Sequence, residues 1–213
     1  MLSWTLGGYP CRNIAAAAKY FYERCSYDCH DEKTYPAQLQ FVEAFREFPF
    51  HIRVLYLGPH NAGPSTLLFE KPTGYSSTMT GFAYDNLESW RSVYPVEVFE
   101  TQFARLCEKW EKGLDMLGED ESETAIMARA AYCLFKASLN QIRFIRCRDS
   151  KKYAEAIAAA RDELKTTEMM LELMNKNAAI GYEAANHYYF SKGQLVEKII
   201  NCKYIIERFG SYV

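Results

Sequence analysis

The segment between Gly58 and Pro95 gathers the largest group of side chains that could bind a ligand. It mixes aromatic rings with amide, carboxylate and guanidinium groups, and it follows neither a helical nor a strand period. Sugars are held by aromatic faces together with bidentate hydrogen bonds from such polar groups. The segment therefore supplies most of the candidate ligand-binding residues: Asn61, Tyr84, Asp85, Asn86, Trp90 and Arg91.

A structural role for the same side chains is the competing interpretation. Asp85 and Arg91 could form an ion pair, while Trp90 and the tyrosines could fix the segment to neighbouring helices. A stretch of this length without regular structure is uncommon in a compact domain unless it functions or packs. Either interpretation predicts an ordered segment.

Two shorter stretches add candidates. In "SWTLGGYP", Trp4 and Tyr9 flank a Gly-Gly turn that could present aromatic faces to a ligand, although core packing would also explain them. In "IGYEAANHYYF", residues 180–190, Glu183 and His187 are four residues apart. On a helix this spacing suits a structural ion pair, a proton relay or half of a metal site.

Metal and cofactor sites are not expected. Cys25, Cys29 and His30 could begin a metal site, but no second pair of ligands follows at a suitable spacing. The sequence also lacks a Walker loop, a dinucleotide glycine pattern, G-x-S-x-G and H-E-x-x-H. The usual motifs of nucleotide-binding proteins and of serine hydrolases are therefore absent from this sequence.

Composition narrows the partners and the location. The 213 residues carry a net charge of −2, which gives no basic field for nucleic acid or an acidic membrane surface. No window approaches the roughly 20 apolar residues of a membrane span. The seven Cys are an odd number at scattered spacings, typical of reduced thiols, so we expect a cytoplasmic protein.

The N-terminal part predicts short elements. Residues 2–9 resemble a strand, and Asn13 could cap a helix through residues 14–25. A second helix is expected from about Thr34 to Pro49, with Leu39, Val42, Phe45 and Phe48 on its buried stripe. Residues 50–58 alternate weakly, which favours a strand, although the same nine residues could equally form a helix.

The C-terminal part predicts four long helices. Apolar residues recur at steps of three and four through residues 96–117, 124–147 and 151–175, and again from Leu195. Ser191 and Gln194 form a capping box before the last helix. We therefore predict a mainly α fold, an antiparallel helical bundle with a long ordered loop and at most one or two short strands. Residues 1–95 and 96–213 would be its two parts, packed as one compact unit.

Three stretches of the chain stand out together: "LSWTLGGYP" at 2–10, residues 44–95 and "IGYEAANHYYF" at 180–190. Together they resemble the end portion of large glycoside-hydrolase-like proteins of the hexosaminidase and alpha-glucuronidase types. In such proteins a (β/α)8 barrel precedes a helical domain. The resemblance implies that "LSWTLGG" is the last barrel strand, with Trp4 at its catalytic end stacking on a sugar.

The resemblance also shows a departure. Only one barrel strand fits in this chain, so the strands that would carry paired catalytic carboxylates are missing, and the resemblance assigns no such role to Asp85 or Glu183. We expect a helical accessory domain that is not catalytic alone and contributes sugar-binding residues. There are two alternatives. One is a helical protein-protein or small-ligand interaction module, and the other is an intact hydrolase of unfamiliar type using Glu183, His187 and Asp85. Expected partners are an oligosaccharide, a second copy of the chain or a barrel domain.

Overall fold

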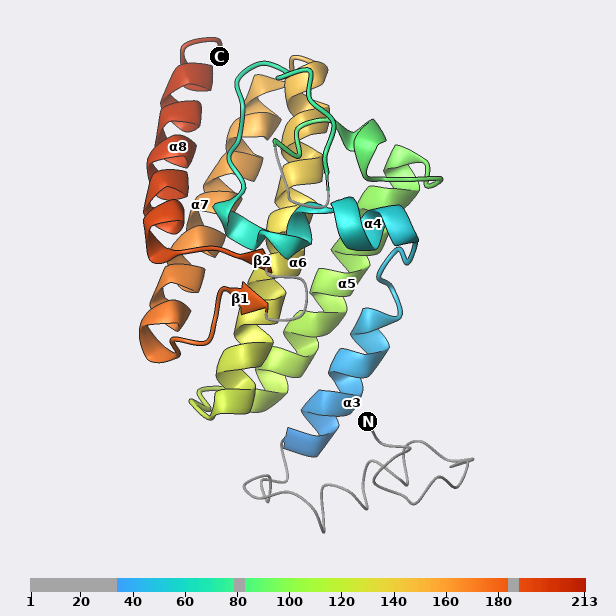
Figure 1. The fold of residues 1–213 in the computed structure, drawn as a ribbon, viewed down its shortest axis with the longest axis vertical. Helices are drawn as coiled ribbons and strands as arrows, with labels where there is room; N and C mark the ends of the chain where they lie inside the picture. Colours follow the sequence, from blue (N-terminus) through green and yellow to red (C-terminus); the bar gives the residue numbers. More distant parts are fainter. Residues whose placement is uncertain (1–33, 79–82, 184–187) are drawn as a thin grey trace.

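The computed structural model describes residues 34–78, 83–183 and 188–213, and these form a mainly helical bundle with a long ordered loop (Figure 1). The predicted fold class is confirmed. Trp4, Tyr9, the expected first strand and the expected first helix lie outside the described residues. The described elements are α3 (Thr34–Phe45), α4 (Ile52–Leu57), α5 (Val96–Leu117), α6 (Glu123–Asp149), α7 (Tyr153–Lys176), α8 (Lys192–Gly210), β1 (Tyr182–Glu183) and β2 (Tyr188–Tyr189).

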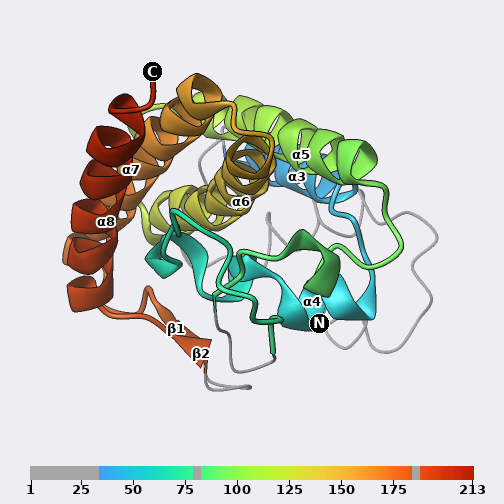
Figure 2. The same cartoon turned by 90° about the horizontal axis from the view of Figure 1, so that it is seen from above.

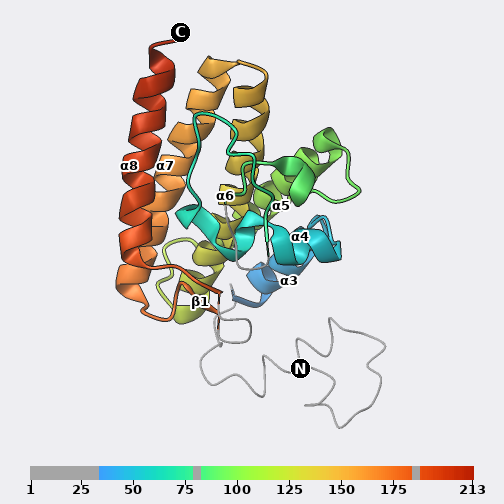
Figure 3. The same cartoon turned by 45° about the horizontal axis from the view of Figure 1, so that its top comes forward.

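The long helices pack in the order α3, α5, α6, α7, α8, so that α6 lies in the interior of the row (Figure 2). Sixteen of the 27 residues of α6 are buried, because neighbours cover it on several sides. The loop after α4 crosses one face of this row in front of α6 and α7 (Figure 3). Among the described residues, no helix combines the length and the apolar character that a membrane span requires.

The predicted signals of α5 and α8 are confirmed. Phe99, Phe103 and Leu106 of the α5 seam are buried with no exposed surface. Ser191 caps α8 through the predicted box, since its Oγ accepts from the Gln194 backbone N–H at 3.3 Å and the Gln194 side chain accepts from Ser191 N–H at 2.8 Å. Local sequence alone places these elements.

The buried face of α3 differs from the prediction. Leu39, Val42 and Phe45 are 37%, 57% and 49% exposed, whereas Ala37, Phe41 and Ala44 face α5; of the predicted stripe, Phe48 is buried. Gly113 of α5 explains the choice, because a Cβ there would lie 2.3 Å from the Phe41 ring. Phe41 fills that space and stacks on Trp110 at 4.6 Å between ring centroids. A glycine in the partner helix therefore decided which face of α3 packs.

Residues 52–57 form the helix α4, so the strand expected there is wrong. His51 caps the helix, with its Nδ1 accepting from the Arg53 backbone N–H at 3.1 Å. Val54 alone of the six residues is buried, and Ile52 is 58% exposed. Residues 52–57 do not join the two-stranded β1–β2 sheet, which is the sheet of the described residues, and the His51 cap favours a short helix instead.

The loop is ordered because alternate residues of an extended stretch bind α8. Lys198 Nζ donates to the Thr66 carbonyl, and the Asn201 side chain pairs with both backbone groups of Leu68, at 2.8 Å to N and 2.9 Å to O. One helical turn further on, Glu70 accepts three hydrogen bonds, from Tyr204, Arg208 and Tyr212. The Thr66 carbonyl and both backbone groups of Leu68 thus find side-chain partners in place of a sheet neighbour.

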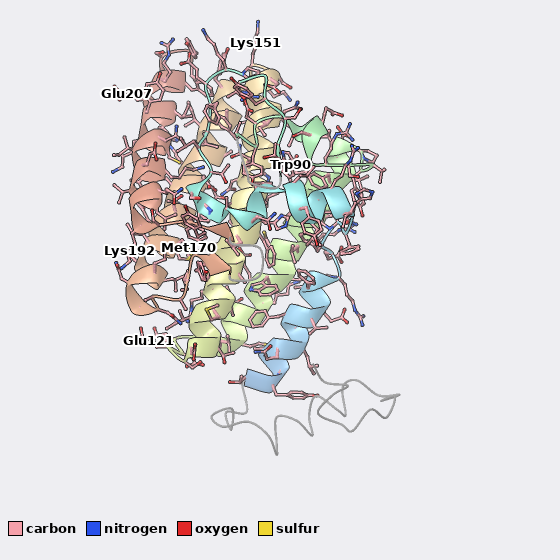
Figure 4. All side chains as sticks on the ribbon, viewed as in Figure 1. Trp90, Glu121, Lys151, Met170, Lys192 and Glu207 are labelled. Atoms are coloured by element: carbon pink, nitrogen blue, oxygen red, sulfur yellow. The ribbon has the colours of Figure 1, made fainter. Side chains whose placement is uncertain are left out.

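Trp90, labelled in Figure 4, is fully buried and meets Phe99 edge to face at 5.3 Å. We expect Trp90→Ala to lower the free energy of unfolding by about 3–5 kcal/mol, because a large ring would leave a cavity between loop and helix. Denaturant titration would measure this. Phe50→Ala, which removes a ring that is 70% exposed, should change stability by less than about 0.5 kcal/mol. Equal costs for the two variants would contradict the burial of Trp90.

Candidate functional site

A cleft of about 470 Å³ opens between the loop and two helix ends, and it contains the predicted residues Asp85 and Asn86. The loop contributes one wall, including the short 3-10 turn η3 (Leu87–Ser89), and the first turn of α5 and the last turn of α6 contribute the other. The lining residues are Pro72, Gly74, Asp85, Asn86, Leu87, Glu88, Val96, Glu97, Ile145, Arg146, Arg148, Asp149 and Ser150.

Asp85 lies at the floor of the cleft with both carboxylate oxygens bound. Thr73 donates to Oδ2 from its backbone N–H at 2.7 Å and to Oδ1 from its hydroxyl at 2.8 Å. Arg148 Nη1 lies 3.4 Å from Oδ2, and Nη2 donates to the Asp85 carbonyl at 3.0 Å. The Asp85 and Arg148 side chains are 1% and 3% exposed, so this is a buried ion pair.

Arg148 also binds a second stretch of the loop, and its contacts with the two stretches are called the Arg148 clamp. Its Nη1 donates to the Phe69 carbonyl at 3.2 Å, and its Nε donates to Asp149 at 2.8 Å. One guanidinium group of α6 thereby holds residues 69 and 85 together. The expected pairing of Asp85 with Arg91 is wrong, since Arg91 instead binds Glu88 at 2.5 Å.

The predicted aromatic residues Tyr84 and Trp90 do not line the cleft. Tyr84 is 4% exposed, and its carbonyl accepts from Gln141 Nε2 at 3.2 Å. Trp90 has no exposed surface. Ala83 and Tyr84 both have positive φ angles, 62° and 46°, which rotate the chain so that Asp85 turns towards Arg148. Because the rings of Tyr84 and Trp90 are buried, they pack inside the protein and do not offer a surface on which a sugar could stack.

The rim of the cleft carries the groups that a ligand could reach. Asn86 uses its Oδ1 to cap η3, accepting from Glu88 N–H at 3.1 Å. The Glu97 side chain is 76% exposed and contacts Arg146 at 3.2 Å, and that of Asp149 is 49% exposed. The lining contains four carboxylates and two guanidinium groups, a net charge of −2. Such a rim can donate and accept hydrogen bonds but disfavours an anion.

A second, apolar pocket brings Asn61 together with the predicted stretch 180–190. This pocket of about 200 Å³ lies between α6, α7 and the β1–β2 hairpin. The helix expected here is wrong at its described positions, since Tyr182–Glu183 and Tyr188–Tyr189 are strands. The pairing of Glu183 with His187 stays a prediction, because His187 and the Glu183 side chain lie outside the described residues. The two predicted clusters therefore separate into a polar cleft at Asp85 and an apolar pocket at Asn61.

Sequence reasoning missed the two buried cations that position the loop, Arg148 and Lys198. A signal for both existed. Lys198 falls between Leu195 and Cys202 on the buried stripe of α8, and Arg148 continues the stripe of Ile145 on α6. A charged residue on an apolar seam must find a partner, because an unpaired buried charge is very costly.

Searches against protein-family models, curated proteins and solved structures find no match for this chain. The site therefore rests on its geometry. In the described part of the chain, no group of three or more His, Cys, Asp or Glu side chains could hold a metal ion.

Replacing Arg148 tests the clamp. We expect Arg148→Met to lower the free energy of unfolding by about 3–5 kcal/mol, because it leaves the Asp85 carboxylate buried without its cation. Hydrogen exchange should become faster at residues 69–73 and 85. Arg91→Met, which removes an ion pair with the largely exposed Glu88, should cost at most about 1 kcal/mol. A small effect at Arg148 would show that the pair does not hold the loop.

His60 makes stability depend on pH. Both ring nitrogens are buried, and burial lowers the pKa of His60 from 6.5 to about 4. As the pH falls, the unfolded chain therefore takes up a proton at His60 before the folded protein does. The contribution of neutral His60 to the free energy of unfolding is fully present above pH 6.5 and is lost as the pH falls towards 4. Urea titrations should show about 2–3 kcal/mol less pH dependence over this window in His60→Leu. Parallel pH profiles for the two proteins would contradict it.

Proposed function

We propose that this chain is a helical accessory domain that is not catalytic alone and that binds a hydroxylated, sugar-like ligand in the cleft beside Asp85. The cleft itself carries the proposal. Its volume of about 470 Å³ falls in the range of small-ligand sites, about 300–1,000 Å³. Its lining combines apolar and hydrogen-bonding side chains, as a sugar with C–H faces and hydroxyl edges requires.

The two kinds of group come from separate elements. Leu87, Val96 and Ile145 supply apolar contacts, while Asn86 and Glu97 offer hydrogen-bonding groups. The guanidinium of Arg146, held by Glu97 and Glu100, adds donors on the wall that the two helix ends form. Because the net charge of the lining is negative, neutral hydroxylated ligands are favoured over phosphorylated or acidic ones.

The engaged state of Asp85 argues against a catalytic role for this carboxylate. Both of its carboxylate oxygens accept hydrogen bonds, and the side chain is 1% exposed. A general acid or nucleophile must reach the reacting atoms. The resemblance to glycoside-hydrolase-like proteins points to the same class of ligand, with catalysis assigned to a barrel domain.

Calorimetry with a panel of neutral monosaccharides and oligosaccharides tests this function. We expect saturable binding for at least one member. Glu97→Ala should weaken that binding about tenfold or more, because a hydrogen bond to a charged group contributes about 1.5–3 kcal/mol.

Glu108→Ala is the matched control. Glu108 is an exposed carboxylate on the same helix, pairs with Lys112 at 3.0 Å and lies outside the cleft, so its loss should leave the affinity unchanged. No heat with any member of the panel, or equal effects of both substitutions, would refute the proposal.

A further inference from the structure

The apolar pocket beside the β1–β2 hairpin differs in chemistry from the cleft. None of its lining residues is charged, and its wall consists of short and apolar side chains of α6 and α7, such as Ala130, Ala131, Leu134 and Met170. Met170, labelled in Figure 4, has no exposed surface and lies against the hairpin side of the bundle. A hydroxylated ligand would find little to bind there.

The volume of the pocket fits one ring. Cavities of about 150 Å³ lined by aliphatic and aromatic side chains stay dry and bind benzene. This pocket measures about 200 Å³, enough for a single six-membered or indole-sized ring. Met127 and Met170 add polarizable thioethers, which make favourable contacts with ring edges.

The hairpin holds the pocket open on one side. Gly181 has a φ of 94°, and a Cβ at this position would lie 2.6 Å from the Phe190 carbonyl, so the turn into β1 requires glycine. Phe190 N–H donates to the Gly181 carbonyl at 2.8 Å and closes the hairpin beside the pocket. Glycine at position 181 therefore keeps a side chain out of the turn into β1, on the wall that Ile180, Tyr182 and Phe190 complete.

The lining includes one exposed tyrosine, Tyr182, and one amide, that of Asn61. Tyr182 and Tyr189 are directly paired across the strands, so their side chains share one face, and they are 63% and 69% exposed. Asn61 donates from Nδ2 to the Leu55 carbonyl at 2.9 Å, and none of the described residues donates to its Oδ1. An acceptor thus stands beside an apolar, aromatic-rimmed opening.

We propose that this pocket is a binding site, separate from the sugar-like cleft, for one planar aromatic ring that carries an N–H donor, of the indole type. The ring would lie among Met127, Met170 and Tyr182, with its N–H directed to Asn61 Oδ1. A free small aromatic compound and a tryptophan side chain of a partner polypeptide share this chemistry.

The protein with 13C-labelled methionine methyl groups, titrated with indole, provides the test. The Met127 and Met170 signals should shift and saturate together, while Met116, which is 43% exposed on α5 and outside the pocket, should not move. 1-Methylindole, which lacks the donor, should bind at least threefold more weakly. N-acetyltryptophanamide distinguishes the sources: binding as tight as that of indole indicates a side chain, and loss of binding indicates a free compound.

Ala131→Leu should fill the pocket and weaken indole binding at least tenfold. Ala158→Leu adds the same side chain to an exposed position of α7 and should leave the affinity unchanged. Unsaturable shifts, shifts that include Met116 equally, or unchanged affinity in Ala131→Leu would overturn the proposal. The titrations of the unaltered protein decide the matter even if that variant folds poorly.

Discussion

The buried ion pair between Arg148 and Asp85 is the contact on which the arrangement of the loop depends. A guanidinium group can satisfy several acceptors in one plane, and here it joins a carboxylate, a loop carbonyl and a neighbouring carboxylate. Residues 69 and 85, which lie in two irregular stretches of the loop, are thereby fixed to the last turn of α6. The cleft exists because this contact holds the loop at a set distance from α5 and α6.

A second buried cation fixes the other end of the same segment. Lys198 has no exposed surface, and its Nζ lies 3.2 Å from Glu163 Oε1 while also donating to the Thr66 carbonyl. Asn140 donates to the other oxygen of Glu163 at 3.0 Å. Burial raises the pKa of Glu163, and the charge of Lys198 opposes that rise. Helices α6, α7 and α8 and the loop meet in this one polar cluster inside an apolar bundle.

We interpret these buried ion pairs as contacts that specify the structure more than they stabilise it, since desolvation offsets much of their attraction. Their placement is consistent with that view. Arg148 and Lys198 both bind backbone carbonyls of the loop, so a shifted loop would leave a buried charge unpaired. The apolar pocket, in contrast, depends on glycine geometry at the hairpin and on alanines in α6. Polar contacts thus shape the cleft, and small side chains shape the pocket.

The local sequence was sufficient for the long helices, but not for the surroundings of the candidate residues. The apolar seam of α5 and the Ser191–Gln194 box could be predicted because helical spacing and capping involve residues three or four positions apart. Asp85 and Asn86 could be chosen by chemical type alone, although the partner of Asp85 could not.

Only the tertiary structure decided the rest. Gly113 of α5 selected the buried face of α3, and Arg148, 63 positions away in the chain, became the partner of Asp85 instead of nearby Arg91. The tertiary structure also placed Asn61 in the apolar pocket, apart from the other residues of its predicted cluster. Periodicity records which residues avoid water, but complementary shape and charge between distant segments determine what each of them meets.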